Sequence, residues 1–241
     1  MSARRVVVAL ATGDRSARLV REAARVAARL SAELEGCFLE DEDLLRLAAH
    51  SFAHWMGSAG EARALRADDL EREWRAVAGE MRASLEREAA SHRVVARFEV
   101  RRGRPRDALS HRVERGDIVV VGWGGWAPSA RRAAPVRVLY DGSEAADRAL
   151  EAGLRLAGEE GRLAVWIAGA GEGALDAMRA RLAGRAAHVA PMAEPSVAAV
   201  RHALDERPGG LLLVPAGSVI ADALAAGAEE ARFPASVLVV H

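Results

Sequence analysis

The sequence contains no lysine, asparagine or glutamine, and every basic residue other than histidine is arginine. Such a composition is typical of GC-rich coding, so arginine clusters such as residues 101–106 are interpreted as solvated turns rather than phosphate-binding patches. Lysine and arginine together number 34, as do aspartate and glutamate, and the formal net charge is zero. A dedicated nucleic-acid-binding protein normally carries an excess of basic residues, so this balance argues against a nucleic-acid partner.

The chain also has little cysteine and no long apolar run. Its single cysteine, Cys37, excludes an intramolecular disulfide framework and favours a reducing compartment. The longest stretch without charge, residues 208–221, is shorter than the ~18 apolar residues that a membrane-spanning helix needs. The first apolar run stops at Ala11 and is followed by Asp14, so no signal peptide is expected. We therefore expect a cytoplasmic protein with no membrane partner.

Short apolar runs alternate with helix-period segments along the whole chain. Residues 5–11 are apolar after the first arginine, which is typical of a strand covered on both faces. Residues 17–30 then place apolar side chains on one side of a helix. Strands separated by helices pair in parallel through right-handed crossovers, so the sequence predicts an α/β fold with helices on both faces. The expected strands are 5–11, 34–39, 94–100, 118–121, 135–140, 163–168, 188–192, 211–214 and 237–240, and the expected helices are 17–30, 106–114, 144–157, 174–182, 197–204 and 219–231.

Residues 43–92 form an insertion between the second and third expected strands. Its second part carries an apolar stripe at helical spacing, which predicts a long amphipathic helix that packs on its own sheet, with a partner-binding face as the alternative. His50 and His54 are four residues apart and could share a helical face as metal ligands, but no third ligand accompanies them, so ordinary packing is favoured. The stripe consists of Leu70, Trp74, Val77, Met81 and Leu85.

The order of strands and helices restarts near residue 135, which we interpret as an internal duplication with repeats 1–134 and 135–241. Residues 126–134, between a glycine turn and the next strand, are too few for a helix and a strand, which together need roughly twenty residues. The first repeat is therefore predicted to be truncated to four strands. An exposed edge strand is normally covered, so we expect the second repeat or another protomer to cover residues 118–121, with Trp123 and Trp126 at the contact.

Three segments carry a family likeness. Residues 138–144 (VLYDGSE) form an opening strand with an acidic turn, and residues 119–125 (VVVGWGG) form a strand followed by glycines. Residues 234–240 (PASVLVV) match a Pro-x-Pro-Val-Leu-Val-Val final strand, with Ser236 in place of the second proline. Together they resemble the universal stress protein family in a tandem arrangement. The resemblance covers nearly the whole chain outside the insertion and implies two Rossmann-like, adenine-nucleotide-alpha-hydrolase-like parallel sheets.

The resemblance also implies where a nucleotide would bind. Family members that bind ATP use an aspartate after strand one and a Gly-x-x-Gly-(nine residues)-Gly-Ser/Thr loop after strand four, where glycines let backbone N–H groups approach phosphates. The residues that match parts of this set are Gly122, Gly124 and Gly125 in the first half, and Asp141, Gly142, Gly217 and Ser218 in the second.

Each half departs from the family pattern in a different way. In the first half, Ala11 stands at the aspartate position and Pro135 at the distal glycine. In the second, Val214 replaces the first glycine, and Gly227 is followed by Ala228 instead of a hydroxyl residue. A loop without its distal Gly-Ser/Thr loses two or three hydrogen bonds to charged oxygens, at about 1.5–3 kcal/mol each. The departures predict nucleotide binding that is weaker by several orders of magnitude.

We therefore expect a non-catalytic regulatory or scaffold protein of the universal stress type, which requires no cofactor. We also expect it to form a homodimer and to act on an unidentified protein partner. The alternative is an adenine-nucleotide-binding protein that holds ATP or AMP with the matching residues and, in the first half, with Ser129 and Arg131 or Arg132. An enzyme is not expected, because the sequence lacks a Gly-x-Ser-x-Gly elbow, a Gly-Lys-Ser/Thr loop and a Cys/His metal cluster. A weak nucleotide hydrolase is the remaining enzymatic alternative. Cys37 is expected to be buried and unreactive.

Overall fold

The computed structural model describes residues 4–10, 16–50, 54–56, 62–103, 113–122, 135–159, 161–169, 171–227 and 233–241. Its main strands are β1 Arg5–Leu10, β2 Glu33–Asp41, β5 Ala96–Gly103, β6 Asp117–Gly122, β7 Val136–Tyr140, β8 Leu163–Ala168, β9 Ala187–Met192, β10 Leu211–Pro215 and β11 Ser236–Val240. A small hairpin consists of β3 His54–Met56 and β4 Ala62–Ala64. The helices are α1 Ser16–Leu30, α2 Glu42–Ala48, α3 Ala67–His92, α4 Glu144–Ala157, α5 Glu172–Arg181, α6 Val197–Asp205 and α7 Val219–Ala225.

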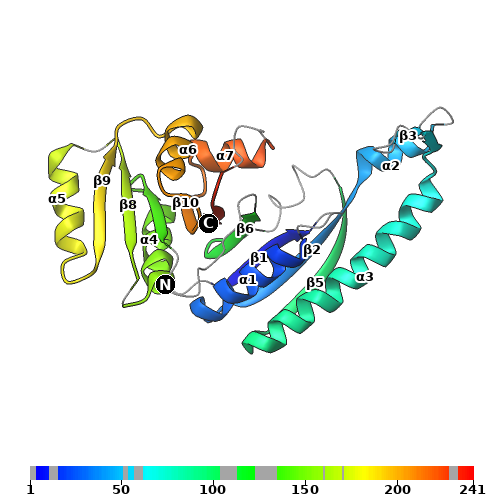
Figure 1. The fold of residues 1–241 in the computed structure, drawn as a ribbon, viewed down its shortest axis with the longest axis horizontal. Coiled ribbons are helices and arrows are strands. Elements are labelled where there is room, and N and C mark those ends of the chain that lie inside the picture. The colour runs from blue at the N-terminus through cyan, green and yellow to red at the C-terminus, as the bar shows by residue number, and fades with distance from the viewer. Residues whose placement is uncertain are drawn as a thin grey trace.

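The main strands form one nine-stranded sheet in the order β5-β2-β1-β6-β11-β10-β7-β8-β9 (Figure 1). Every neighbouring pair is parallel except β6 and β11, which are antiparallel. The predicted α/β class with parallel strands and helices on both faces is confirmed. The two expected sheets, however, are joined edge to edge into a single one, because β6 and β11 each offer the other an unpaired edge.

The β6–β11 pair forms the seam between the halves of the chain. Ser236 lies opposite Gly122 and Val240 opposite Ile118, with five residue pairs in register. The expectation that the second half covers the edge of residues 118–121 is thus confirmed. Among the described residues before 135, four strands belong to the main sheet. Trp123 and Trp126, expected at this contact, lie outside the described residues.

Helices cover the two faces of the sheet with separate hydrophobic layers. One layer packs side chains of α1, α3 and α4 on the sheet, and the other packs side chains of α6 and α7 on the opposite face (Figure 1). In the first layer, α4 approaches β7 so closely that a Cβ on Gly153 would lie 2.6 Å from Val138 Cγ2. Ser143 caps α4, since its hydroxyl accepts a hydrogen bond from Ala146 N at 3.1 Å.

The insertion packs on its own half of the sheet, as predicted. In α3 the apolar stripe is buried at Leu70, Trp74, Met81 and Leu85, and it belongs to the same core layer as α1. His50 follows α2 whereas His54 begins β3, so these histidines do not share a helix face. Within the described ranges no group of three or more His, Cys, Asp or Glu could hold a metal ion. No helix in those ranges is both long and apolar enough to cross a membrane.

Two expected helices fall partly beyond the described residues. Of residues 106–114, the structure describes Val113 and Glu114, which are not helical. Of the expected helix 219–231, the structure shows α7 up to Ala225, followed by a turn at 226–227.

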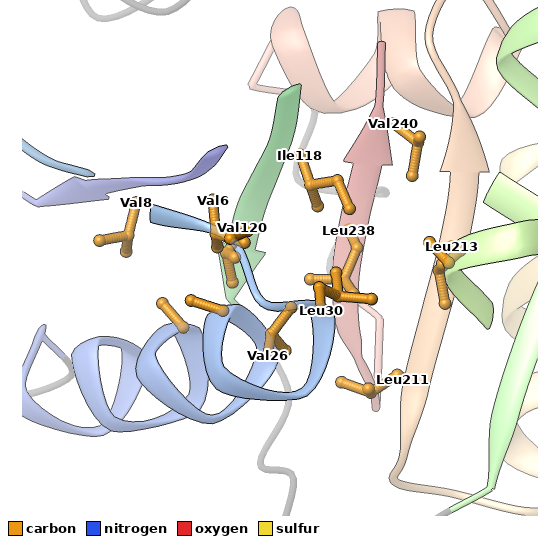
Figure 2. Close-up of a cluster of buried hydrophobic side chains, with 14 of the residues drawn as sticks. Val6, Val8, Val26, Leu30, Ile118, Val120, Leu211, Leu213, Leu238 and Val240 are labelled. Carbon is orange, nitrogen blue, oxygen red and sulfur yellow. The ribbon is translucent and has the colours of Figure 1, made fainter. Parts of the chain in front are cut away.

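Fully buried aliphatic side chains fill the seam beneath β6 and β11 (Figure 2). They come from α1, from the strands of the first half and from the strands of the second half, so the cluster belongs to both halves at once. The labelled members are Val6, Val8, Val26, Leu30, Ile118, Val120, Leu211, Leu213, Leu238 and Val240.

A reciprocal pair of arginines joins α1 to α4 across the same seam. Arg29 Nη1 donates to Leu156 O at 2.7 Å, and Arg155 Nη2 donates to Leu30 O at 2.5 Å. Arg29 precedes Leu30, and Arg155 precedes Leu156. Each helix therefore donates from its arginine and accepts at its leucine carbonyl, so exchanging the two helices reproduces the same pair of contacts. A cation near the C-terminus of a helix is favourable because it satisfies unpaired carbonyls and opposes the helix dipole.

Each of these arginines should contribute measurably to stability. We expect Arg29→Ala and Arg155→Ala each to lower the free energy of unfolding by about 1 kcal/mol, since each removes a charged donor from a partly buried carbonyl. Arg179→Ala is the matched control, because that arginine forms an exposed pair with Asp176 on one helix, and such pairs contribute little. Urea titrations followed by circular dichroism measure all three. Losses no larger than that of the control would contradict a role at the seam.

Candidate functional site

The second half contains a topological switch point between β7 and β10. From β7 the chain proceeds to β8 and β9 on one side, whereas β10 pairs with β7 on the other. In open α/β sheets, ligands bind at the carboxyl ends of the strands at such a point. Asp141 and Gly142 directly follow β7, and the turn with Gly217 and Ser218 follows β10. The structure therefore brings these four predicted residues to one edge of the sheet.

The predicted residues of the first half do not form a describable site. Gly122 is the last residue of β6 and is paired with Ser236 of β11. Gly124 and Gly125 lie outside the described residues, as do Ser129, Arg131 and Arg132.

After β7, the acidic turn directs its polar groups to its own backbone. The carboxylate of Asp141 accepts a hydrogen bond from Ser143 N at 3.0 Å, and Gly142 between them has φ +83°. A left-handed φ of this kind favours glycine, which explains the Asp-Gly-Ser sequence of the turn. Asp141 nevertheless remains exposed to solvent.

After β10, the turn uses its hydroxyl group internally. Ser218 is buried, and its Oγ donates to Pro215 O at 2.7 Å while accepting from Ala221 N at 3.2 Å. Ser218 therefore caps α7. Val214 and Pro215 are strand residues opposite Val239 and Val240 of β11. The chain therefore continues as buried strand where the family's glycine loop would begin.

Space remains above both turns. A Cβ built on Gly142 or on Gly217 meets no described heavy atom within 4 Å. Gly217 has φ +79° and is exposed. A small group could therefore approach the turns, although their own side chains supply few free donors toward it.

Acidic residues occupy the first turns of three helices that begin at this edge, α4, α5 and α7. Glu144 and Asp147 lie in the first turn of α4, Glu172 in that of α5, and Asp222 in that of α7. Negative side chains at these positions complement the positive end of the helix dipole. For the same electrostatic reason they repel phosphate groups, which the helix N-termini would otherwise attract.

Tyr140, Asp147 and Arg181 form one hydrogen-bonded group beside this edge. Tyr140 OH donates to Asp147 Oδ1 at 2.9 Å, and Arg181 Nη1 lies 2.6 Å from the same oxygen. Arg181 lowers the pKa of Asp147, whereas burial and the bond to Asp147 raise the pKa of Tyr140. The carboxylate is thus held ionised and already occupied by two donors.

A turn from the first half reaches the edge and was not predicted. Arg115 forms an ion pair with Glu144, and Gly116 N donates to His241 O at 2.7 Å. Arg148 Nε donates to the same carbonyl at 2.8 Å, and its Nη1 lies 3.8 Å from Glu144 Oε2. Burial lowers the pKa of His241. These contacts depend on the antiparallel seam, for which no local sequence pattern exists.

Two further features lie away from this edge. Cys37 is buried in β2, and burial raises its pKa to about 11, which agrees with the expected unreactive thiol. A surface groove lies between α2 and the first turns of α3, but none of the predicted site residues lines it.

The elements described above define a Rossmann-like α/β protein with doubly wound strand order. No family model and no curated protein matches the chain. Among solved structures, it is similar to the crystal structure of a universal stress protein from Archaeoglobus fulgidus DSM 4304, with a TM-score of 0.64. The match has 17% sequence identity and covers 97% of this chain and 95% of that chain. The fold of this chain is therefore that of a universal stress protein, and the predicted resemblance is confirmed at the level of the fold.

Proposed function

We propose that the protein is a cytoplasmic, non-catalytic regulatory protein of the universal stress type, with a degenerate nucleotide site in its second half. One observation carries the proposal: at the β7–β10 switch point, the residues that would cradle phosphates are engaged elsewhere. Val214 and Pro215 extend β10, and the hydroxyl of Ser218 is used twice within its own turn. Among the described residues that follow β10, a triphosphate would find neither the glycine loop nor a free hydroxyl.

Electrostatics supports the same proposal. Asp222 lies in the first turn of α7, the helix that would face the phosphates, and Glu144 lies in the first turn of α4. An unscreened like charge near a phosphate disfavours binding by an amount that grows as water is excluded. Weak binding of triphosphates is the expected consequence.

Catalysis is not part of the proposal, for a chemical reason. The serines at the switch point, Ser143 and Ser218, both cap helices through Oγ. No hydrogen bond joins either serine to a histidine within the described ranges, and an activated serine needs such a base.

The regulatory role implies protein partners, and we include a homodimer among them. The edges of β6 and β11 are already paired with each other. A homodimer would therefore use another surface than this seam.

The second candidate function is weak binding of AMP or another adenosine compound. The open space above Gly142 and Gly217 favours it, together with the exposed carboxylate of Asp141, which could accept hydrogen bonds from a base or ribose. This function would need no phosphate loop.

Release of bound nucleotide tests the proposal. We expect the protein, purified and then denatured, to release no stoichiometric nucleotide by absorbance and mass spectrometry. In a thermal-shift experiment, ATP at a concentration equal to its Kd would stabilise the folded protein by about 0.4 kcal/mol. At one hundred times Kd, the stabilisation would be ~2.7 kcal/mol. We expect millimolar ATP to stay at or below the smaller figure. Stoichiometric ATP in the supernatant would overturn the proposal, and AMP-specific stabilisation that is lost in Asp141→Ala but kept in Asp176→Ala would favour the second candidate.

A further inference from the structure

Two arginines from different halves of the chain converge on one carboxylate beside the switch point. Glu144, the first residue of α4, forms ion pairs with Arg115 from the turn before β6 and, at 3.8 Å, with Arg148 one helical turn further along α4. Glu144 directly follows the turn of Asp141, Gly142 and Ser143. The cluster therefore adjoins the candidate site, and its two arginines lie outside the segments that match the family pattern.

The side chain of Arg148 and the backbone beside Arg115 are held by contacts other than Glu144. The side chain of Arg148 is 15% exposed, and its Nε is held by His241 O at 2.8 Å. Arg115 stands on a turn whose next residue, Gly116, donates to that same carbonyl at 2.7 Å. The Arg148 guanidinium and the turn that carries Arg115 would therefore stay near each other if the carboxylate moved away.

Glu144 itself is held only weakly. Its side chain is 73% exposed, and that of Arg115 is 62% exposed. Ion pairs as exposed as this contribute about 0–1 kcal/mol. A guanidinium binds a phosphate group with short, charge-assisted hydrogen bonds, and two guanidinium groups at one point suit a doubly charged anion.

We propose that Arg115 and Arg148 form a binding position for a phosphate group, and that Glu144 occupies this position as an autoinhibitory contact. The inference deepens the proposed function, because it assigns a means of regulation to the degenerate site of the second half. The carboxylate is tethered beside the arginines, so it competes at a high effective concentration. A phosphate-bearing ligand binds here once Glu144 is displaced or its charge is removed, and it then links the two halves through Arg115.

Removal of the charge on Glu144 tests this proposal. We expect Glu144→Gln to bind inorganic phosphate about five to ten times more tightly than the unaltered protein, since competition and repulsion are both relieved. The readout is the phosphate concentration that gives half of the maximal shift in Tm, with ionic strength held constant by chloride because screening would otherwise change in parallel. Circular dichroism verifies that each variant is folded.

Two further variants separate the proposed site from a general charge effect. Glu172→Gln removes one negative charge from the first turn of α5 and is expected to bind phosphate as the unaltered protein does. Adding Arg115→Ala to Glu144→Gln is expected to abolish the gain. The inference is wrong if Glu144→Gln binds no more tightly than the unaltered protein, if Glu172→Gln gains as much, or if the double variant keeps the gain.

AMP in place of inorganic phosphate identifies the source of the phosphate group. A gain in Glu144→Gln that is equal for both ligands assigns the site to the phosphate group alone, and a larger gain for AMP assigns it to a nucleotide. Failure of the proposed function is recognised separately, because that function is tested by nucleotide released from the unaltered protein.

Discussion

Replacement of Asp117 by alanine is expected to lower the free energy of unfolding by about 3–5 kcal/mol, because it leaves a partly buried guanidinium without its main partner. Asp117 is fully buried at the start of β6, and its carboxylate accepts bonds from Arg5 Nη2 at 2.5 Å and Nε at 3.2 Å. It also accepts from Glu114 N at 2.9 Å. The bond to Asp117 is the largest cause that raises the pKa of Arg5. The guanidinium nevertheless stays charged in the variant, because arginine is not deprotonated in proteins.

Glu35 limits the loss of stability in Asp117→Ala, and a substitution of Glu35 provides the control. Arg5 Nη1 lies 2.7 Å from Glu35 Oε2, so one ion pair survives in Asp117→Ala. Glu35→Gln keeps the shape and leaves the Asp117 bonds in place, and it should cost less than half as much. Replacing Arg5 by Met, Glu35 by Gln and Asp117 by Leu together should recover most of the loss, because all three charges of the group are then removed and none is left buried without its partner. Urea unfolding followed by circular dichroism measures each variant, and a loss below 1 kcal/mol for Asp117→Ala would contradict the argument.

Local patterns in the sequence were sufficient to predict most helices and strands. The helix 144–157 and the strand 163–168 coincide with α4 and β8. In α4, an apolar face combines with a serine cap at one end and Gly158 at the other, so three local signals agree. The start of α5 was predicted two residues late, because Gly171 caps it without a side-chain hydrogen bond and leaves no recognisable signal.

The joining of the halves could be foreseen only in outline. The short spacing after residue 122 predicted that the β6 edge is covered, but its antiparallel partner, the reciprocal Arg29 and Arg155 contacts and the ion pair of Arg115 depend on residues far apart in the chain. Periodicity and turn chemistry contain no information on such long-range contacts.

In the candidate site, too, local features could be predicted from the sequence and long-range contacts could not. Ser143 and Ser218 both cap helices, a role that a serine directly before a helix indicates from local spacing alone. The gathering of Asp141 and Gly217 at one edge followed from strand order. That Glu144 and Arg115 meet there could not be derived, because it requires the turn at 113–116 to lie against the end of β11.

Leu238→Ala is expected to destabilise the whole chain by about 3 kcal/mol, since it opens a cavity where the halves meet. Leu238 is fully buried in the middle of β11, opposite Val120 of β6, and belongs to the cluster that includes Val6 and Leu30 (Figure 2). Its loss therefore removes packing from both halves together. By contrast, Leu47→Ala should change stability by less than about 0.5 kcal/mol, because Leu47 is 48% exposed.

The form of the unfolding curve distinguishes a shared seam from two independent halves. Trp74 is buried in the first half and Trp166 in the second. The fluorescence change on unfolding therefore depends more on the second half in a Trp74→Phe background and more on the first half in a Trp166→Phe background. If the seam couples them, Leu238→Ala shifts the urea midpoint equally in both backgrounds and in circular dichroism, with one transition throughout. The seam consists of β6 from the first half and β11 from the second. If one half unfolds, the edge strand of the other half is therefore left exposed. Two separated transitions, or a loss below 1 kcal/mol, would show that the halves are stable without each other.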